Sequence, residues 1–171
     1  MLNISTARLT IRETDSNTVK PISAKNQASG GSDLFSALSD NDEWYVFANK
    51  DALCDLLSKL LSYEGNGACL FFDVWLDSTL IGYIGLKKHT DPTPEIQIEF
   101  DPEYQHRGYG YEALSKMIDH FFAMGHNCLR YVVKPSNKAS IALVEKVGGQ
   151  LQPPDSEDEG LLLRTYLITN Q

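Results

Sequence analysis

Cysteine is scarce in this sequence, and its three residues lie far apart, at Cys54, Cys69 and Cys128. No CxxC pair occurs, and an odd number of widely spaced cysteines in apolar surroundings does not build a disulfide framework. We therefore expect thiols in the hydrophobic core. The four histidines show no metal-ligand spacing either, so no metal is expected.

Long hydrophobic runs and an excess of positive charge are also missing. No apolar stretch approaches the roughly 20 residues that cross a bilayer, and the first residues lack a basic segment followed by an apolar one. The formal net charge is -8, which opposes nucleic-acid binding because that function needs clustered lysine and arginine. We expect a cytoplasmic protein with no membrane or nucleic-acid partner, for which a cationic amine is easier to accommodate.

The length and the order of elements indicate one α+β domain. A chain of 171 residues suits one core and is short for two, so we expect a single domain over residues 1–171. Alternating or apolar β-type runs predict strands at 8–12, 68–76, 79–87, 94–100, 128–133 and 161–169. Helical spacing predicts helices near 34–38 and at 51–63, 109–124 and 136–147. The second to fourth strands are expected to be antiparallel neighbours, with a helical crossover after the fourth.

One glycine-containing loop stands out between the predicted strand ending at Phe100 and the helix that follows. Such a loop at a helix N-terminus presents unpaired N–H groups and the positive end of the helix dipole, which suits a phosphate or pyrophosphate. Gly108 and Gly110 would let a ligand approach the backbone, and Arg107 adds positive charge. The same glycines would also suit an ordinary tight turn.

The loop, as Gln105-His106-Arg107-Gly108-Tyr109-Gly110, resembles the acetyl-coenzyme A loop of the GNAT acyltransferase superfamily, whose pattern is Gln/Arg-x-x-Gly-x-Gly/Ala. Asn137-x-x-Ser140 and the opening Thr6–Arg12 are similar to the branch that includes ribosomal-protein N-terminal acetyltransferases and their small-molecule-modifying relatives. The similarity covers nearly the whole chain and is vaguest over residues 13–50.

This resemblance implies a GNAT-like fold with a mixed, mainly antiparallel sheet of six or seven strands flanked by about four helices. It also implies an N-acetyltransferase that uses acetyl-coenzyme A as cosubstrate, without a metal. The acceptor would be a primary amine on a protein N-terminus, a lysine or a small molecule. The protein would act as a monomer or homodimer.

The resemblance further implies which residues bind the coenzyme. The pantetheine arm would pair with the strand before the loop, at Ile98 and Phe100 and at the intervening Glu99 backbone. The pyrophosphate would be held by the loop amides of Gln105, His106, Arg107, Gly108, Tyr109 and Gly110. Asn137 would contact the coenzyme arm, although an asparagine at a helix start also commonly bonds its own backbone.

The reaction requires a base because an amine with a reference pKa of about 10.4 is protonated at neutral pH. Glu99, and behind it Glu95, lie on the polar face of the strand before the loop and are the candidate bases, directly or through a water. The same carboxylates would also suit a solvated strand face.

The departing thiolate needs a proton or stabilisation. Many family members use a tyrosine in the second helix, where this chain has Val144. The branch resemblance makes Ser140 the replacement candidate; a capping or packing role for that serine is an equal alternative.

The missing tyrosine keeps a second class of function open, namely a non-catalytic acyl-coenzyme A binding module with a regulatory or partner role. A dinucleotide-binding interpretation of the loop lacks the parallel βαβ context and the acidic ribose partner. Acceptor recognition is predicted for Trp44 and Tyr45 and for the acidic segment at Asp155, Glu157, Asp158 and Glu159, which would equally suit a solvated loop.

Overall fold

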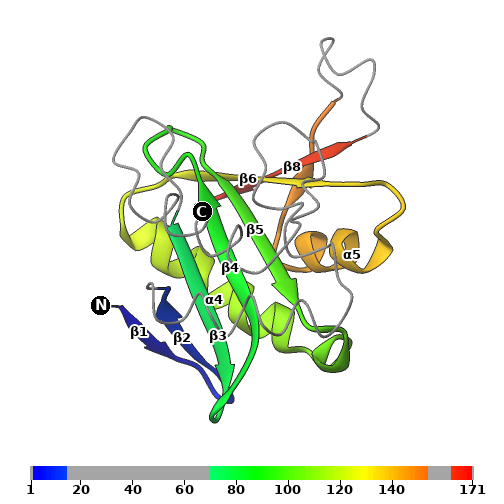
Figure 1. Cartoon of the computed structure of the whole chain (residues 1–171). Coiled ribbons are helices and arrows are strands. Elements are labelled where there is room, and N and C mark those ends of the chain that lie inside the picture. Colours follow the sequence, from blue (N-terminus) through cyan, green and yellow to red (C-terminus); the bar gives the residue numbers. More distant parts are fainter. Residues whose placement is uncertain (1, 15–69, 154–162, 171) are drawn as a thin grey trace, which may run out of the picture.

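The computed structural model describes residues 2–14, 70–153 and 163–170 of the chain (Figure 1). Its eight strands are β1 (Asn3–Ser5), β2 (Thr10–Glu13), β3 (Leu70–Leu76), β4 (Thr79–Lys87), β5 (Glu95–Phe100), β6 (Cys128–Val133), β7 (Gln150–Leu151) and β8 (Arg164–Thr169). Its helices are the 3₁₀ helix η1 (Pro102–Tyr104), α4 (Tyr109–Ala123) and α5 (Lys138–Lys146).

The strands form one sheet in the order β1-β2-β3-β4-β5-β6-β8-β7. All neighbours are antiparallel except β5 and β6, which are parallel. Parallel neighbours need a crossover connection, and α4 supplies it by packing across the sheet between them (Figure 1). The α+β class and the mainly antiparallel mixed sheet are confirmed.

The core lies between the sheet and α4. Leu114, Met117 and Phe121 recur at helical spacing on one face of α4 and are fully buried. On β5, Ile96 and Phe100 point into the same cluster. The alternation along β5 therefore leaves Glu95, Gln97 and Glu99 on the opposite face, as their spacing predicted.

The central hairpin follows its predicted course. β3 and β4 are joined at Asp77, whose positive φ of 53° supports the tight turn. The register shifts between Val74 and Trp75, so one residue of β4 bulges there. Gly82 then pairs with Phe100 so closely that an added methyl group at Gly82 would lie 2.3 Å from the Glu99 carbonyl oxygen.

Several predicted bounds and counts were wrong. The sheet has eight strands rather than six or seven, because β1 and β7 are too short to show a sequence pattern. β2 begins at Thr10, since Arg8 lies in the turn that binds α4, and α5 begins at Lys138, since Asn137 caps it. Cys128 is half-buried rather than a core residue, and burial raises the pKa of its thiol.

Other predictions fall outside the described residues. These are the helices near 34–38 and at 51–63, the two remaining cysteines, and the proposed acceptor-binding residues at 44–45 and 155–159. Neither α4 nor α5 is long and apolar enough to cross a membrane, and the same holds for every other helix in the described ranges.

Candidate active site between strands β5 and β6

A gap opens between β5 and β6. The two strands pair at a single position, Glu95 with Arg130, where the Arg130 N–H donates to the Pro94 carbonyl at 2.9 Å. Beyond this pair they diverge toward their C-terminal ends, with the start of α5 beside the end of β6 (Figure 1). The edge of β5 after Glu95 therefore faces no described strand.

The register determines which backbone groups face this gap. The Asp101 N–H donates to the Ile81 carbonyl at 2.9 Å. Because antiparallel hydrogen bonding alternates, Glu99 exchanges its backbone bonds with β4, whereas the N–H and C=O groups of Ile98 and Phe100 point toward the gap. The expected edge contacts at Ile98 and Phe100 fit this geometry, and a Glu99 backbone contact does not.

The loop after β5 brings an uncapped helix start to the same place. The Gln105 side chain turns back and donates from Nε2 to the Phe100 carbonyl at 2.8 Å. His106 and Gly108 have positive φ values of 58° and 83°, and Gly108 is the N-cap of α4. Among the described residues no side chain caps this helix, so its first-turn N–H groups are available to an anion.

Arg8 fastens the loop to α4 and was not predicted as a site residue. Its guanidinium forms a 2.7 Å salt bridge with Glu112 in the first turn of α4, donates to the Arg107 carbonyl at 3.1 Å, and lies over the Tyr109 ring. Thr6 also donates to Glu112. Burial raises the pKa of Glu112, but the hydrogen bonds from Thr6 and Arg8 and the Arg8 charge together lower it.

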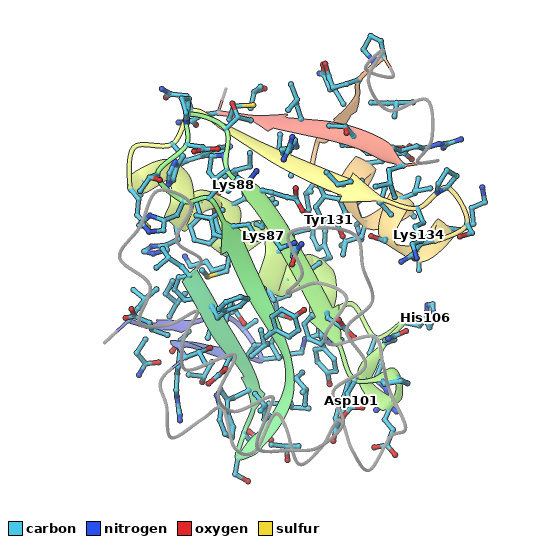
Figure 2. The ribbon with its side chains drawn as sticks, turned by 45° about the horizontal axis from the view of Figure 1, so that its top comes forward. Lys87, Lys88, Asp101, His106, Tyr131 and Lys134 are labelled. Carbon is cyan, nitrogen blue, oxygen red and sulfur yellow. The ribbon has the colours of Figure 1, made fainter. Side chains whose placement is uncertain are left out.

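The start of α5 forms the other side of the gap. The Asn137 side chain accepts a hydrogen bond from the Ser140 N–H at 3.1 Å and so caps the helix. The Ser140 hydroxyl lies 2.7 Å from the hydroxyl of Tyr131, which comes from β6 where that strand leaves β5 (Figure 2). Tyr131 is a second residue that the sequence analysis missed, because its alternating strand pattern is that of a core side chain.

The two helices approach each other at the end of β5. A methyl group added at Gly110 would lie 3.4 Å from Leu143 Cδ2 and 3.9 Å from the Phe100 ring. Ser140 lies one turn before Leu143 on the same face of α5. The loop, the edge of β5 and the Ser140 hydroxyl therefore converge on one region of the molecule.

The two candidate bases differ in their surroundings. Glu99, next to the loop, accepts a 3.4 Å hydrogen bond from the hydroxyl of Tyr83. Burial and then the Glu99 charge raise the pKa of Tyr83 well above its ordinary value, so Tyr83 stays a donor. Glu95 lies at the closed end of the gap, where it binds Arg130 at 3.2 Å and accepts from Gln97 at 3.1 Å.

The site is built from backbone amides, hydroxyls and carboxylates. Within the described ranges, no group of histidine, cysteine, aspartate and glutamate side chains is arranged to hold a metal ion. Asp101 and His106 lie beyond the end of β5, and Lys134 lies beyond the end of β6 (Figure 2). The backbone groups on this edge of β5 can pair with an extended ligand, and the start of α4 suits an anionic end of that ligand.

Comparison with known proteins gives one family and a set of similar folds. Residues 9–150 match the model of an acetyltransferase (GNAT) domain. No curated protein has a significantly similar sequence. Ribosomal-protein-S5-alanine acetyltransferase from Vibrio fischeri superposes with a TM-score of 0.79 at 15% identity, covering 100% of this chain and 98% of that one.

Two further structures contain coenzyme A. Spermidine N-acetyltransferase from Vibrio cholerae, in complex with coenzyme A and spermine, has a TM-score of 0.74 at 20% identity and coverages of 95% and 96%. The ribosomal L7/L12 α-N-protein acetyltransferase RimL, in complex with coenzyme A, has a TM-score of 0.74 at 16% identity and coverages of 98% for each chain. At these identities the likeness shows the fold.

Proposed function

Because the chain belongs to the GNAT acetyltransferase family, we propose that it transfers an acetyl group from acetyl-coenzyme A to a primary amine by direct attack of the amine on the thioester. It is an acyl-coenzyme A dependent N-acetyltransferase by that membership. The acceptor is an amine of a protein N-terminus, a lysine or a small molecule, classes that include the acceptors named for the similar structures.

One observation carries the proposal: among the described residues, the edge of β5 after Glu95 pairs with no strand, and the loop that follows it, in which Gln105 binds the Phe100 carbonyl, leads to a start of α4 that no described side chain caps. The amide groups of the pantetheine arm suit the backbone of Ile98 and Phe100, and the pyrophosphate suits the amides that follow Gly108. The order of groups along the cosubstrate thus matches the order of groups along the gap. Gln105, His106, Arg107, Tyr109 and Gly110 complete the proposed binding loop.

Glu99 is the proposed general base. It lies on the polar face of β5 at the end nearest the loop, and the Tyr83 hydroxyl holds its carboxylate. From there it takes the proton of the incoming ammonium group, which frees the nitrogen lone pair for attack. Glu95 is the weaker candidate because its carboxylate is bound to Arg130 at the closed end.

Ser140 is the proposed donor to the departing sulfur. Its hydroxyl lies at the start of α5, on the face that meets the loop end of α4. The fully buried Val144, one turn later, has no hydroxyl to offer. Asn137 is a proposed contact of the coenzyme arm, through the amide group that its capping oxygen leaves available.

Calorimetric titration with acetyl-coenzyme A tests the donor site. Gly108 and Gly125 lie at the two ends of α4 with φ values of 83° and 103°, so Gly108→Ala and Gly125→Ala strain the backbone similarly. We expect Gly108→Ala to weaken binding about tenfold or more and Gly125→Ala to leave it unchanged. Equal affinities in both variants would contradict the proposed loop.

Product formation separates the enzyme from the non-catalytic module. Release of coenzyme A that depends on added amine, with an acetylated amine detected by mass spectrometry, supports acetyl transfer. Tight acetyl-coenzyme A binding without product across peptide, lysine and polyamine acceptors would support the binding module instead. The single domain over residues 1–171, the cytoplasmic location and the monomer or homodimer also stay predictions.

A further inference from the structure

Tyr131 and Ser140 place two hydroxyl groups 2.7 Å apart at the gap. Tyr131 is the first residue of β6 beyond the single pair formed by Arg130 with β5, so its side chain leaves the sheet where the gap begins. It is 4% exposed and packs in the core cluster, whereas Ser140 is half-buried. The hydroxyl pair therefore runs from a side chain in the core to a half-buried side chain at the start of α5.

We propose that the Tyr131 hydroxyl positions the Ser140 hydroxyl as the hydrogen-bond donor to the sulfur of coenzyme A. This inference rests on the proposed acetyl transfer. Tyr131 is a positioning residue, because it acts through Ser140 and does not itself reach the sulfur. Val144 of α5 has no hydroxyl to donate a hydrogen bond to the sulfur. In this proposal Ser140, in the first turn of α5, donates it with the support of Tyr131 on β6.

Either hydroxyl of the pair could be the donor, and the proposal takes Tyr131 as the donor. Burial raises the pKa of Tyr131, and the hydrogen bond with Ser140 offsets this only in part, so the phenol stays protonated at neutral pH. A protonated phenol that donates to Ser140 Oγ leaves the serine hydrogen free to point elsewhere. Since Ser140 already has its N–H bound to Asn137, only its hydroxyl hydrogen is left to serve a ligand.

The step is balanced as follows. The amine nitrogen bonds to the acyl carbon, the carbon–sulfur bond breaks, and its electron pair stays on sulfur. Ser140 gives its hydrogen to that sulfur and regains one from a water, which in turn takes the second proton that the amine nitrogen loses as the amide forms. Glu99 passes the first proton, which it took from the ammonium group, to solvent. While Ser140 Oγ is short of a proton, the hydrogen bond from Tyr131 stabilises its negative charge.

A titration of bound coenzyme A tests the pair without an acceptor. The thiolate absorbs in the ultraviolet, so the thiol pKa of coenzyme A bound to the full chain can be followed directly. A donor aimed at the sulfur favours the thiolate and lowers that pKa. We expect Tyr131→Phe and Ser140→Ala each to raise it by about one unit, and the double variant to raise it no further than Ser140→Ala alone.

Tyr166→Phe is the matched control. Tyr166 is the cross-strand partner of Tyr131 on β8, is 1% exposed, and donates its hydroxyl to Glu145 away from Ser140. The Tyr166→Phe variant therefore loses a buried phenol hydroxyl, as Tyr131→Phe does. The thiol pKa should stay at the wild-type value in this variant.

Each outcome decides a different question. A thiol pKa that responds to Ser140→Ala but not to Tyr131→Phe would reduce Tyr131 to a packing role. Equal shifts in Tyr131→Phe and Tyr166→Phe would show a general effect of core loosening. If the wild-type chain does not bind coenzyme A at all, the proposed acetyl transfer fails and takes this inference with it.

Discussion

Arg8 and Glu112, 104 residues apart in the sequence, are joined by a 2.7 Å salt bridge and by a 2.8 Å hydrogen bond from the Arg8 N–H. The same guanidinium reaches the carbonyl of Arg107 in the proposed pyrophosphate loop. The turn after β1 thus holds the loop in the shape that presents the amides of α4. Binding by a preorganised loop avoids the entropy of ordering it.

Glu112→Gln should weaken acetyl-coenzyme A binding and lower stability. The amide keeps the shape of the carboxylate but loses the charge that holds Arg8, so we expect a loss of about 1 kcal/mol in unfolding free energy. Binding should weaken several-fold, because the loop loses its tether. Urea unfolding and calorimetry measure the two effects. If the destabilised variant bound acetyl-coenzyme A as tightly as wild type, the contact between Arg8 and Glu112 would not be needed for binding by the loop.

Glu112 should also contribute to acid unfolding. Its folded-state pKa lies below its ordinary value, so its contribution to stability is fully present above the unfolded-state pKa of about 4.3. That contribution is lost as the pH falls through the folded value. Thermal melts of wild type and Glu112→Gln should therefore differ at neutral pH and converge as the pH falls below the folded-state pKa of Glu112. A difference that persists in acid would rule this linkage out.

Two substitutions of Asn137 separate its capping role from coenzyme binding. Asn137→Ala removes the oxygen that accepts from Ser140 and should cost about 1 kcal/mol of stability. Asn137→Asp keeps a capping oxygen and should retain stability, but it lacks the amide donor. If Asn137 contacts the coenzyme arm, both variants bind acetyl-coenzyme A more weakly by calorimetry. Normal binding by Asn137→Asp would leave this asparagine as a cap only.

Gly82→Ala should damage the site through the backbone of β5. Its methyl group would lie 2.3 Å from the Glu99 carbonyl oxygen, so β5 must shift, and we expect a loss of about 2 kcal/mol or more together with weaker coenzyme binding. Gly85→Ala is the control, because its methyl group would meet the Phe71 ring at 3.1 Å and a side chain can adjust. Chemical unfolding of both variants gives the comparison; similar losses would speak against a backbone collision.

Glu99→Gln should abolish most turnover without affecting coenzyme binding. Removing a general base costs about 100-fold or more in kcat, while the affinity for acetyl-coenzyme A should hold because the Glu99 backbone pairs with β4. Glu103→Gln, in the exposed η1 helix beside the loop, serves as the control for a lost charge. Steady-state rates with a saturating amine test this. Full activity in Glu99→Gln would move the role of base to another residue or a water.

Local patterns were sufficient for the centre of the fold. The predicted antiparallel strands at 68–76 and 79–87 correspond to β3 and β4, the helical spacing over 109–124 to α4, and the strand pattern over 94–100 to β5. Each of these elements buries one face, so apolar residues recur along its sequence at the spacing of a strand or a helix. The glycine loop could be placed for the same reason, since it lies between two such elements.

Contacts made by the fold could not be predicted in this way. Arg8 reads as an exposed strand residue until the turn after β1 is placed against Glu112. Tyr131 reads as a buried strand residue, which it is; only the position of α5 shows that its hydroxyl meets Ser140. The sequence left Asn137 as either a coenzyme contact or a helix cap. The structure shows the capping hydrogen bond, which could not be placed before the first residue of α5 was known.

The single pair between β5 and β6 has a mechanical consequence. The described sheet has two parts. One contains β1 to β5, the other contains β6, β8 and β7, and a single paired position, Glu95 with Arg130, joins them. A cosubstrate lying along β5 would occupy the place of a further strand between these two parts. Product release would then require the backbone hydrogen bonds between this ligand and β5 to break.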